Sequence, residues 1–187
     1  MCSVEVVLVI AMALLMGDSI FSRLISRYGS QYHPLSKSCC ISGAKVETLK
    51  ALAKTITEWP KVVVLLVGIN NLTHPHVLAE VWKVYVSLVN LLLRRGVTKL
   101  YVCPLLPVAN IYLNHKCGGD LALINFWIRG LFQKKNVTVL SFEHIFLSSG
   151  IVNPTLYCPV IKNRPDYLHP NSKGLSLIHS SILNCIM

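Results

Sequence analysis

The segment 61–68, KVVVLLVG, constrains the fold more than any other stretch of the sequence. It is a short, unbroken apolar run rich in valine, which is typical of a strand buried on both faces of a sheet. Weaker runs of the same kind lie at 4–16, 37–42, 99–104 and 137–142. Segments with the apolar spacing of helices lie at 19–28, 45–59, 76–96, 120–135 and 171–186. Strands that alternate with helices pair in parallel through right-handed crossovers. The sequence therefore predicts an α/β fold, a three-layer α/β/α sandwich around a five-stranded parallel sheet, as one domain over residues 1–187.

The composition favours a well-filled core and an anionic partner. Of the 187 residues, 53% are hydrophobic and only 14% are charged, which argues against disorder. The 18 Lys and Arg residues outnumber the 8 Asp and Glu residues, for a net charge of +10. A charge of this sign favours association with nucleic acid, an anionic membrane surface or a negatively charged substrate. The basic residues are scattered, with only Arg94-Arg95 and Lys134-Lys135 adjacent, so the sequence leaves these partners open.

The cysteines and the N-terminal run favour an intracellular protein, cytoplasmic or nuclear, over a secreted one. The 7 cysteines form no CxxC pair, and an odd number without metal spacing is typical of reduced thiols. The run at 4–16 contains Glu5 and has no Lys or Arg before it, unlike a signal peptide. It is also too short for a membrane span of ~20 residues. His74-Pro-His76 lacks a third ligand at a suitable spacing, so we expect no metal and no other cofactor. The oligomeric state stays open.

Polar or flexible residues follow three of the expected strands. Ligands of parallel α/β sheets bind beyond the carboxyl ends of the strands, which directs attention to Ser19, Gly43 and Asn70. Ser19 offers a hydroxyl group at the start of a helix, where backbone amides favour developing negative charge. Its own N–H, the N–H of Gly43 and the side-chain amide of Asn70 form a candidate oxyanion hole. Asp18 and Asn71, the neighbours of these residues, are secondary candidates.

A serine nucleophile needs a base, which a third group orients. The segment RPDYLHPNSKG, residues 164–174, offers Asp166 and His169, and their spacing of three residues puts both on one side of a helix-like turn. Simpler structural roles compete with this interpretation. Asp18-Ser19 is also a good helix cap, Gly43 a common turn residue, and Asn70 or Asn71 a cap for the next helix.

Together these motifs resemble the four blocks of the SGNH (GDSL-type) hydrolases. The blocks are Gly17-Asp18-Ser19, Gly43, Gly68-x-Asn70 and Asp166-x-x-His169. The resemblance implies a flavodoxin-like sandwich, with Ser19 as nucleophile, His169 as base, Asp166 as its orienting partner, and Ser19, Gly43 and Asn70 as oxyanion donors. The chain looks most like the compact SGNH domains carried by some transposable elements and viruses. It departs from the family at Asn71, where an Asp is usual.

We therefore expect a metal-independent serine esterase that acts on short or medium acyl esters. One alternative is a catalytically degenerate SGNH module that binds RNA or DNA through its basic surface. Another is action on lipid at a bilayer, with Leu105, Leu106, Ile111 and Leu113 in contact with the membrane. The irregular segment 104–119 is expected to shape the substrate pocket.

Overall fold

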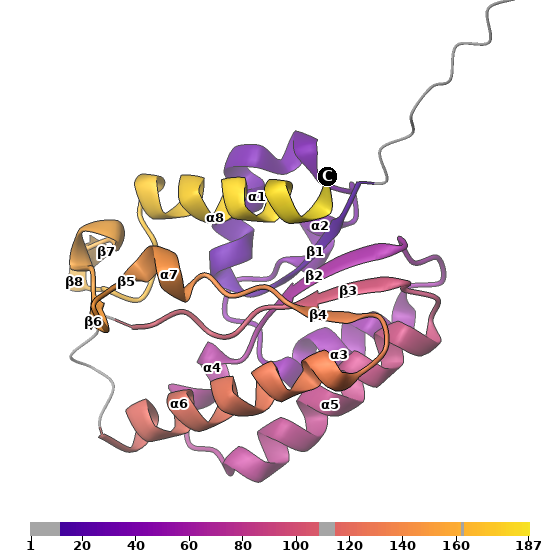
Figure 1. Cartoon of the computed structure of the whole chain (residues 1–187), viewed down its shortest axis with the longest axis horizontal. Coiled ribbons are helices and arrows are strands. Elements are labelled where there is room, and N and C mark those ends of the chain that lie inside the picture. The colour runs from indigo at the N-terminus through magenta and orange to yellow at the C-terminus, as the bar shows by residue number, and fades with distance from the viewer. Residues whose placement is uncertain (1–11, 109–114, 162) are drawn as a thin grey trace, which may run out of the picture.

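The computed structural model describes residues 12–108, 115–161 and 163–187. Within these residues, helices cover both faces of a four-stranded parallel sheet, with α1 and α8 on one face and α3, α5 and α6 on the other (Figure 1). The strands run in the order β1 (Leu14–Gly17), β2 (Val62–Leu66), β3 (Lys99–Val102) and β4 (Val137–Val139). The expected three-layer α/β architecture is confirmed.

The helices are α1 (Ser19–Tyr28), α2 (Ser36–Cys39), α3 (Val46–Thr55), α4 (Ile69–Leu72), α5 (Leu78–Arg94), α6 (His115–Gly130), α7 (Glu143–Phe146) and α8 (Ser172–Ile186). Short 3-10 turns lie at η1 (Gly29–Gln31), η2 (Leu131–Gln133) and η3 (Pro154–Leu156). No helix in the described part of the chain is long and apolar enough to cross a membrane.

The prediction of a fifth strand at 37–42 is wrong. This segment contains the helix α2 and meets β1 through a single bridge, between Gly17 and Cys40. The outer edge of β1 is instead paired by a mixture of groups. The Leu15 N–H donates to Ser36 Oγ at 3.0 Å, and the Cys40 thiol donates to Leu15 O at 3.2 Å. The Ile41 N–H donates to Gly17 O at 2.9 Å. Because these groups satisfy the edge, β1 has no need of a full strand beside it.

Two further boundaries differ from the expectation. Of the expected strand at 4–16, residues 4–11 lie outside the described residues, and β1 begins at Leu14. The segment expected to be irregular, 104–119, turns helical at His115, where α6 begins. Residues 109–114, including Ile111 and Leu113, lie outside the described residues.

A glycine brings the end of β1 close to β2. A Cβ atom at Gly17 would lie 2.5 Å from the backbone oxygen of Leu66 and 2.8 Å from the Phe21 ring. Only glycine therefore fits where the sheet, the start of α1 and the end of β2 converge. This close approach fixes the direction in which the chain leaves the sheet toward Ser19.

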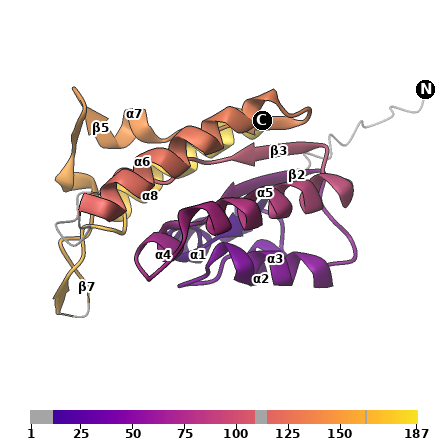
Figure 2. The same ribbon diagram turned by 90° about the horizontal axis from the view of Figure 1, so that it is seen from below.

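Two small hairpins complete the carboxyl-end region of the sheet. They are β5 (Leu147–Ser148) with β6 (Ile151–Val152), and β7 (Val160–Ile161) with β8 (Arg164–Pro165). Figure 2 shows β7 beyond the end toward which the arrows of β2 and β3 point. The chain therefore returns to the carboxyl ends of the strands just before α8 begins.

Candidate active site

Ser19 is the first residue of α1, directly after β1. Asp18 caps this helix, because its Oδ1 accepts a hydrogen bond from the Ile20 N–H at 3.0 Å. The Asp18 N–H donates to Leu66 O at 3.3 Å, which ties the turn to the end of β2. The expected helix-cap role thus belongs to Asp18, and the hydroxyl group of Ser19 stays available for another partner.

That partner is His169, which lies 150 positions away in the sequence. Ser19 Oγ and His169 Nε2 are 2.9 Å apart. The other ring nitrogen, Nδ1, lies 2.8 Å from Asp166 Oδ1, and the backbone N–H of His169 donates to Asp166 Oδ2 at 3.0 Å. Both side chains are largely buried, with 17% of His169 and 12% of Asp166 exposed. The three residues therefore form a continuous Ser–His–Asp chain of hydrogen-bond distances.

Backbone hydrogen bonds to the segment 157–159 hold the loop that carries His169. The Cys158 N–H donates to His169 O at 2.8 Å, and the Asp166 N–H donates to Pro159 O at 2.9 Å. Asn171 then caps α8, with Oδ1 accepting from the N–H groups of Lys173 and Gly174. The loop that carries His169 is thus held by backbone hydrogen bonds before His169 and by the cap of α8 after it.

Asn70 and Gly43 lie in two loops that touch. Gly68 ends the turn after β2 and Asn70 lies within α4, from which its Nδ2 donates to Ala44 O at 3.0 Å. Gly43, next to Ala44, is exposed and has a φ of +78°, a conformation that favours glycine. The structure thus joins the Asn70 side chain to the turn that contains Gly43. One amide hydrogen of Asn70 is donated to Ala44 O, so the second is available to another acceptor.

Asn71 has a structural role of its own. It is 4% exposed, its Oδ1 accepts from the Val46 N–H at 3.0 Å, and its Nδ2 donates to Glu47 Oε2 at 2.9 Å. It therefore caps α3, an earlier helix, and not the next one as its position suggested. An Asp here would place a second carboxylate against Glu47, so the departure at Asn71 is matched by the residue that it contacts.

The environment of Ser19 contains one unusual carboxyl group. Asp18 is fully buried, and burial raises the pKa of its carboxyl from 3.8 to about 7 against the lowering effect of the Ile20 N–H bond. Among the described residues its second oxygen, Oδ2, has no hydrogen-bond partner. A carboxyl group that is about half protonated at pH 7 thus precedes the serine.

The sequence did not point to two residues near the loop of His169, which are Arg23 and Cys158. Arg23, four residues after Ser19 on α1, lies close to the thiol of Cys158, which itself donates to Pro170 O at 3.7 Å. Burial raises the pKa of this thiol, while Arg23 lowers it. The i,i+4 spacing from Ser19 was a signal for Arg23, since it puts both on one helix face. No local signal marked Cys158, whose place depends on the hairpin of β7.

The segment after β3 is pinned and buried. Leu105 exchanges both backbone hydrogen bonds with the Asn125 side chain, at 2.7 and 2.8 Å, and the Tyr157 hydroxyl donates to Pro107 O. Leu105 and Leu106 are 1% and 4% exposed. The expectation that these two leucines contact a bilayer is therefore wrong, because they belong to the core.

His76 also has a defined partner, since its Nε2 lies 2.9 Å from Asp120 Oδ2. This pair joins the loop after α4 to α6. In the part of the chain that the structure describes, no group of three His, Cys, Asp or Glu side chains is arranged to hold a metal ion.

The fold is that of the GDSL-like lipases. One similar structure is a GDSL-like lipase from Bacteroides thetaiotaomicron, at 16% identity and a TM-score of 0.74, covering 94% of this chain and 87% of that one. Another is a member of the lipolytic G-D-S-L family from Veillonella parvula, at 16% identity and a TM-score of 0.70, covering 92% and 96%. The OSK domain of Drosophila Oskar is similar too, at 15% identity and a TM-score of 0.75, covering 91% and 86%. No family model and no curated protein matches the sequence. The resemblance to the SGNH hydrolases therefore holds at the level of the fold.

Proposed function

We propose that the protein is a serine ester hydrolase, with Ser19 as nucleophile, His169 as base and Asp166 as the group that orients the base. The observation that carries this proposal is the pair of distances around His169, 2.9 Å to Ser19 Oγ and 2.8 Å to Asp166 Oδ1. This is the arrangement that a serine needs in order to lose its proton during attack on a carbonyl carbon.

In the proposed reaction, Ser19 Oγ attacks the ester carbonyl while His169 Nε2 takes the serine proton. The new C–O bond gives a tetrahedral intermediate, which collapses to an acyl-serine as His169 returns the proton to the departing alcohol. Water, deprotonated by His169, then attacks the acyl-serine, and His169 returns the proton to Ser19 Oγ as the carboxylic acid is released. Asp166 keeps the imidazole in the required tautomer and stabilises its charged form.

Three donors are proposed to bind the oxyanion: the N–H of Ser19, the N–H of Gly43 and the side-chain amide of Asn70. Ser19 lies at the N-terminus of the ten-residue helix α1, whose partial positive charge adds to theirs. The Asn70–Ala44 contact supports a shared site for the second and third donors. One such donor is worth about 3 kcal/mol of the barrier in other enzymes.

The substrate that we propose is an ester with a short or medium acyl group. Ser19 is 8% exposed and the His169 side chain 17% exposed, so little of this pair is open to solvent. Limited access to the nucleophile favours a small acyl group, such as acetyl, over a long chain that needs an extended apolar pocket.

The test is labelling with a fluorophosphonate probe together with turnover of p-nitrophenyl acetate. We expect the wild type to label and turn over, and Ser19→Ala and His169→Ala to lose about a thousandfold or more in rate. Ser22→Ala, one turn further along α1, is the matched control and should keep both properties. Turnover that survives in Ser19→Ala would contradict the proposal. A folded wild type that neither labels nor turns over would favour the degenerate module instead.

A further inference from the structure

The acidic residues are unevenly distributed between the two helical layers. Two of the described acids, Asp18 and Asp166, accompany α1 and α8; the first is fully buried and the second is bonded to His169. Glu47, Glu80 and Asp120 lie on α3, α5 and α6 of the opposite layer, and Glu58 precedes β2. Glu143 lies on α7, which contacts α8, but it is paired with Arg129 of α6. Within the described residues, therefore, α1, α2 and α8 themselves carry no exposed carboxylate side chain.

The same layer carries exposed bases. Arg27 lies on α1, Lys37 on α2 and Lys173 on α8, and all three are exposed. Arg27 donates a hydrogen bond to Ser172 Oγ at 2.7 Å. The basic side chain of α1 therefore reaches the first turn of α8, in which Lys173 is the next residue. We call this surface, defined by Arg27, Lys37 and Lys173 with the hydroxyl groups between them, the basic face.

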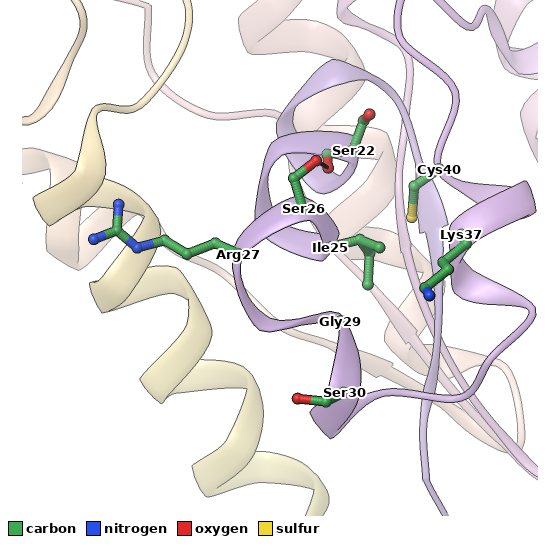
Figure 3. A pocket seen from close by; sticks show the side chains of 8 residues that line it. All are labelled: Ser22, Ile25, Ser26, Arg27, Gly29, Ser30, Lys37 and Cys40. Atoms are coloured by element: carbon green, nitrogen blue, oxygen red, sulfur yellow. Dashed lines mark hydrogen bonds between the residues drawn. The ribbon is translucent and has the colours of Figure 1, made fainter.

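A groove between α1 and α2 runs through the basic face. Its volume is about 500 Å³, and Ser22, Ser26, Ser30 and Lys37 are among the residues that line it. In Figure 3 the Lys37 side chain lies on one side of α1, and Arg27 extends on the other side toward the yellow helix α8. The two cations therefore flank α1, and an extended anion that crosses this helix meets both.

We propose that the basic face binds the sugar–phosphate backbone of a nucleic acid, independently of base sequence. Arg and Lys side chains with serine hydroxyl groups between them are the groups that contact backbone phosphates. The separation of Arg27 and Lys37 across α1 suits a chain of several phosphates better than a single small anion. Because α1, α2 and α8 carry no exposed acidic side chain in the described residues, a polyanion here meets no repulsion like that from Glu47 and Glu80 on the opposite layer. The opposite layer also carries exposed bases, such as Lys54 and Arg94, which the control variant removes. The inference is independent of ester hydrolysis at Ser19.

The test measures binding of a fluorescein-labelled 20-nucleotide single strand, as DNA and as RNA, by anisotropy over a range of salt concentrations. The face variant is Arg27→Gln/Lys37→Gln/Lys173→Gln. The matched control, Lys50→Gln/Lys54→Gln/Arg94→Gln, removes the same charge from α3 and α5 on the opposite layer. Circular dichroism and urea unfolding report whether each variant is folded.

The wild type should bind with a steep salt dependence. The face variant should lose about 2 from the slope of log K against log salt, roughly 0.7 for each lost phosphate contact, and at least tenfold in affinity near 0.1 M salt. The control variant should keep the wild-type slope to within about one contact. Equal losses in both variants, or no binding by the wild type at low salt, would overturn the proposal. So would binding to phosphatidylserine vesicles without binding to the oligonucleotides, which would assign the face to a membrane surface.

Discussion

Asp18 caps a helix with one carboxyl oxygen and leaves the other buried without a hydrogen-bond partner among the described residues. An ionised carboxylate in this place loses its hydration without full compensation, so the protein favours the neutral acid. The consequence can be measured as a pH dependence of stability.

The native pKa of Asp18, about 7, lies above the ordinary value of 3.8 that applies to the unfolded chain. The stabilisation from this group is therefore complete below pH 3.8. It is lost as the pH rises from 3.8 to about 7, and it changes no further at higher pH. The maximum slope is about 1.4 kcal/mol per pH unit.

Asp18→Asn keeps the cap acceptor and removes the titration. We expect the free energy of unfolding of the variant, minus that of the wild type, to rise between pH 4 and pH 7 and then to level off. Urea unfolding at several pH values measures this difference. Taking the difference cancels the contribution of His179, whose burial lowers its pKa and which acts in the opposite direction. A difference that stays constant with pH would show that Asp18 is ionised in the native state.

Between elements, Asn71 links α4 to α3 through its two bonds to Val46 and Glu47. Asn71→Asp keeps the bond to the Val46 N–H but sets a carboxylate against Glu47. We expect it to lower the free energy of unfolding by about 1 kcal/mol, a modest value because Glu47 is exposed.

Adding Glu47→Gln should restore most of this loss, because the glutamine amide can donate a hydrogen bond to the carboxylate introduced at position 71. The double-mutant cycle measures the coupling by urea unfolding. Additive effects of the two changes would show that the contact contributes nothing to stability.

Elements with a strong local pattern could be predicted from the sequence. The spacing of Ile20, Phe21, Leu24 and Ile25 predicted the bounds of α1, and the valine run predicted β2. The segment 37–42 was predicted wrongly because its structure depends on which groups of β1 remain unpaired, a tertiary property. Likewise, sequence order could suggest Ser19 and His169 as partners, but their distance depends on the hairpins that return the chain to the sheet.

At the scale of the whole molecule, the cysteines report on cooperative unfolding. Cys39, Cys40 and Cys103 are buried, Cys158 is half-buried and Cys185 is exposed, all as free thiols. Burial also raises the pKa of each of the three buried thiols, which lowers its thiolate fraction.

Among the described thiols, we expect iodoacetamide to modify Cys185 first and the three buried thiols only when the whole protein unfolds, at one common rate. Mass spectrometry of peptides from a labelling time course measures each rate separately. Labelling in 6 M guanidinium chloride is the control in which all should react. Modification of Cys103 as fast as Cys185 under native conditions would show that this part of the core opens locally.

The pairing of β1 by Ser36, Cys40 and Ile41 has a consequence for the protein in a crowded solution. An edge strand with free amides and carbonyls recruits strands from other molecules and seeds aggregates. On this side of the sheet, a second molecule must first displace α2 and expose the buried Ser36. Self-association through β1 is therefore tied to partial unfolding, which helps a chain that is 53% hydrophobic to remain dispersed.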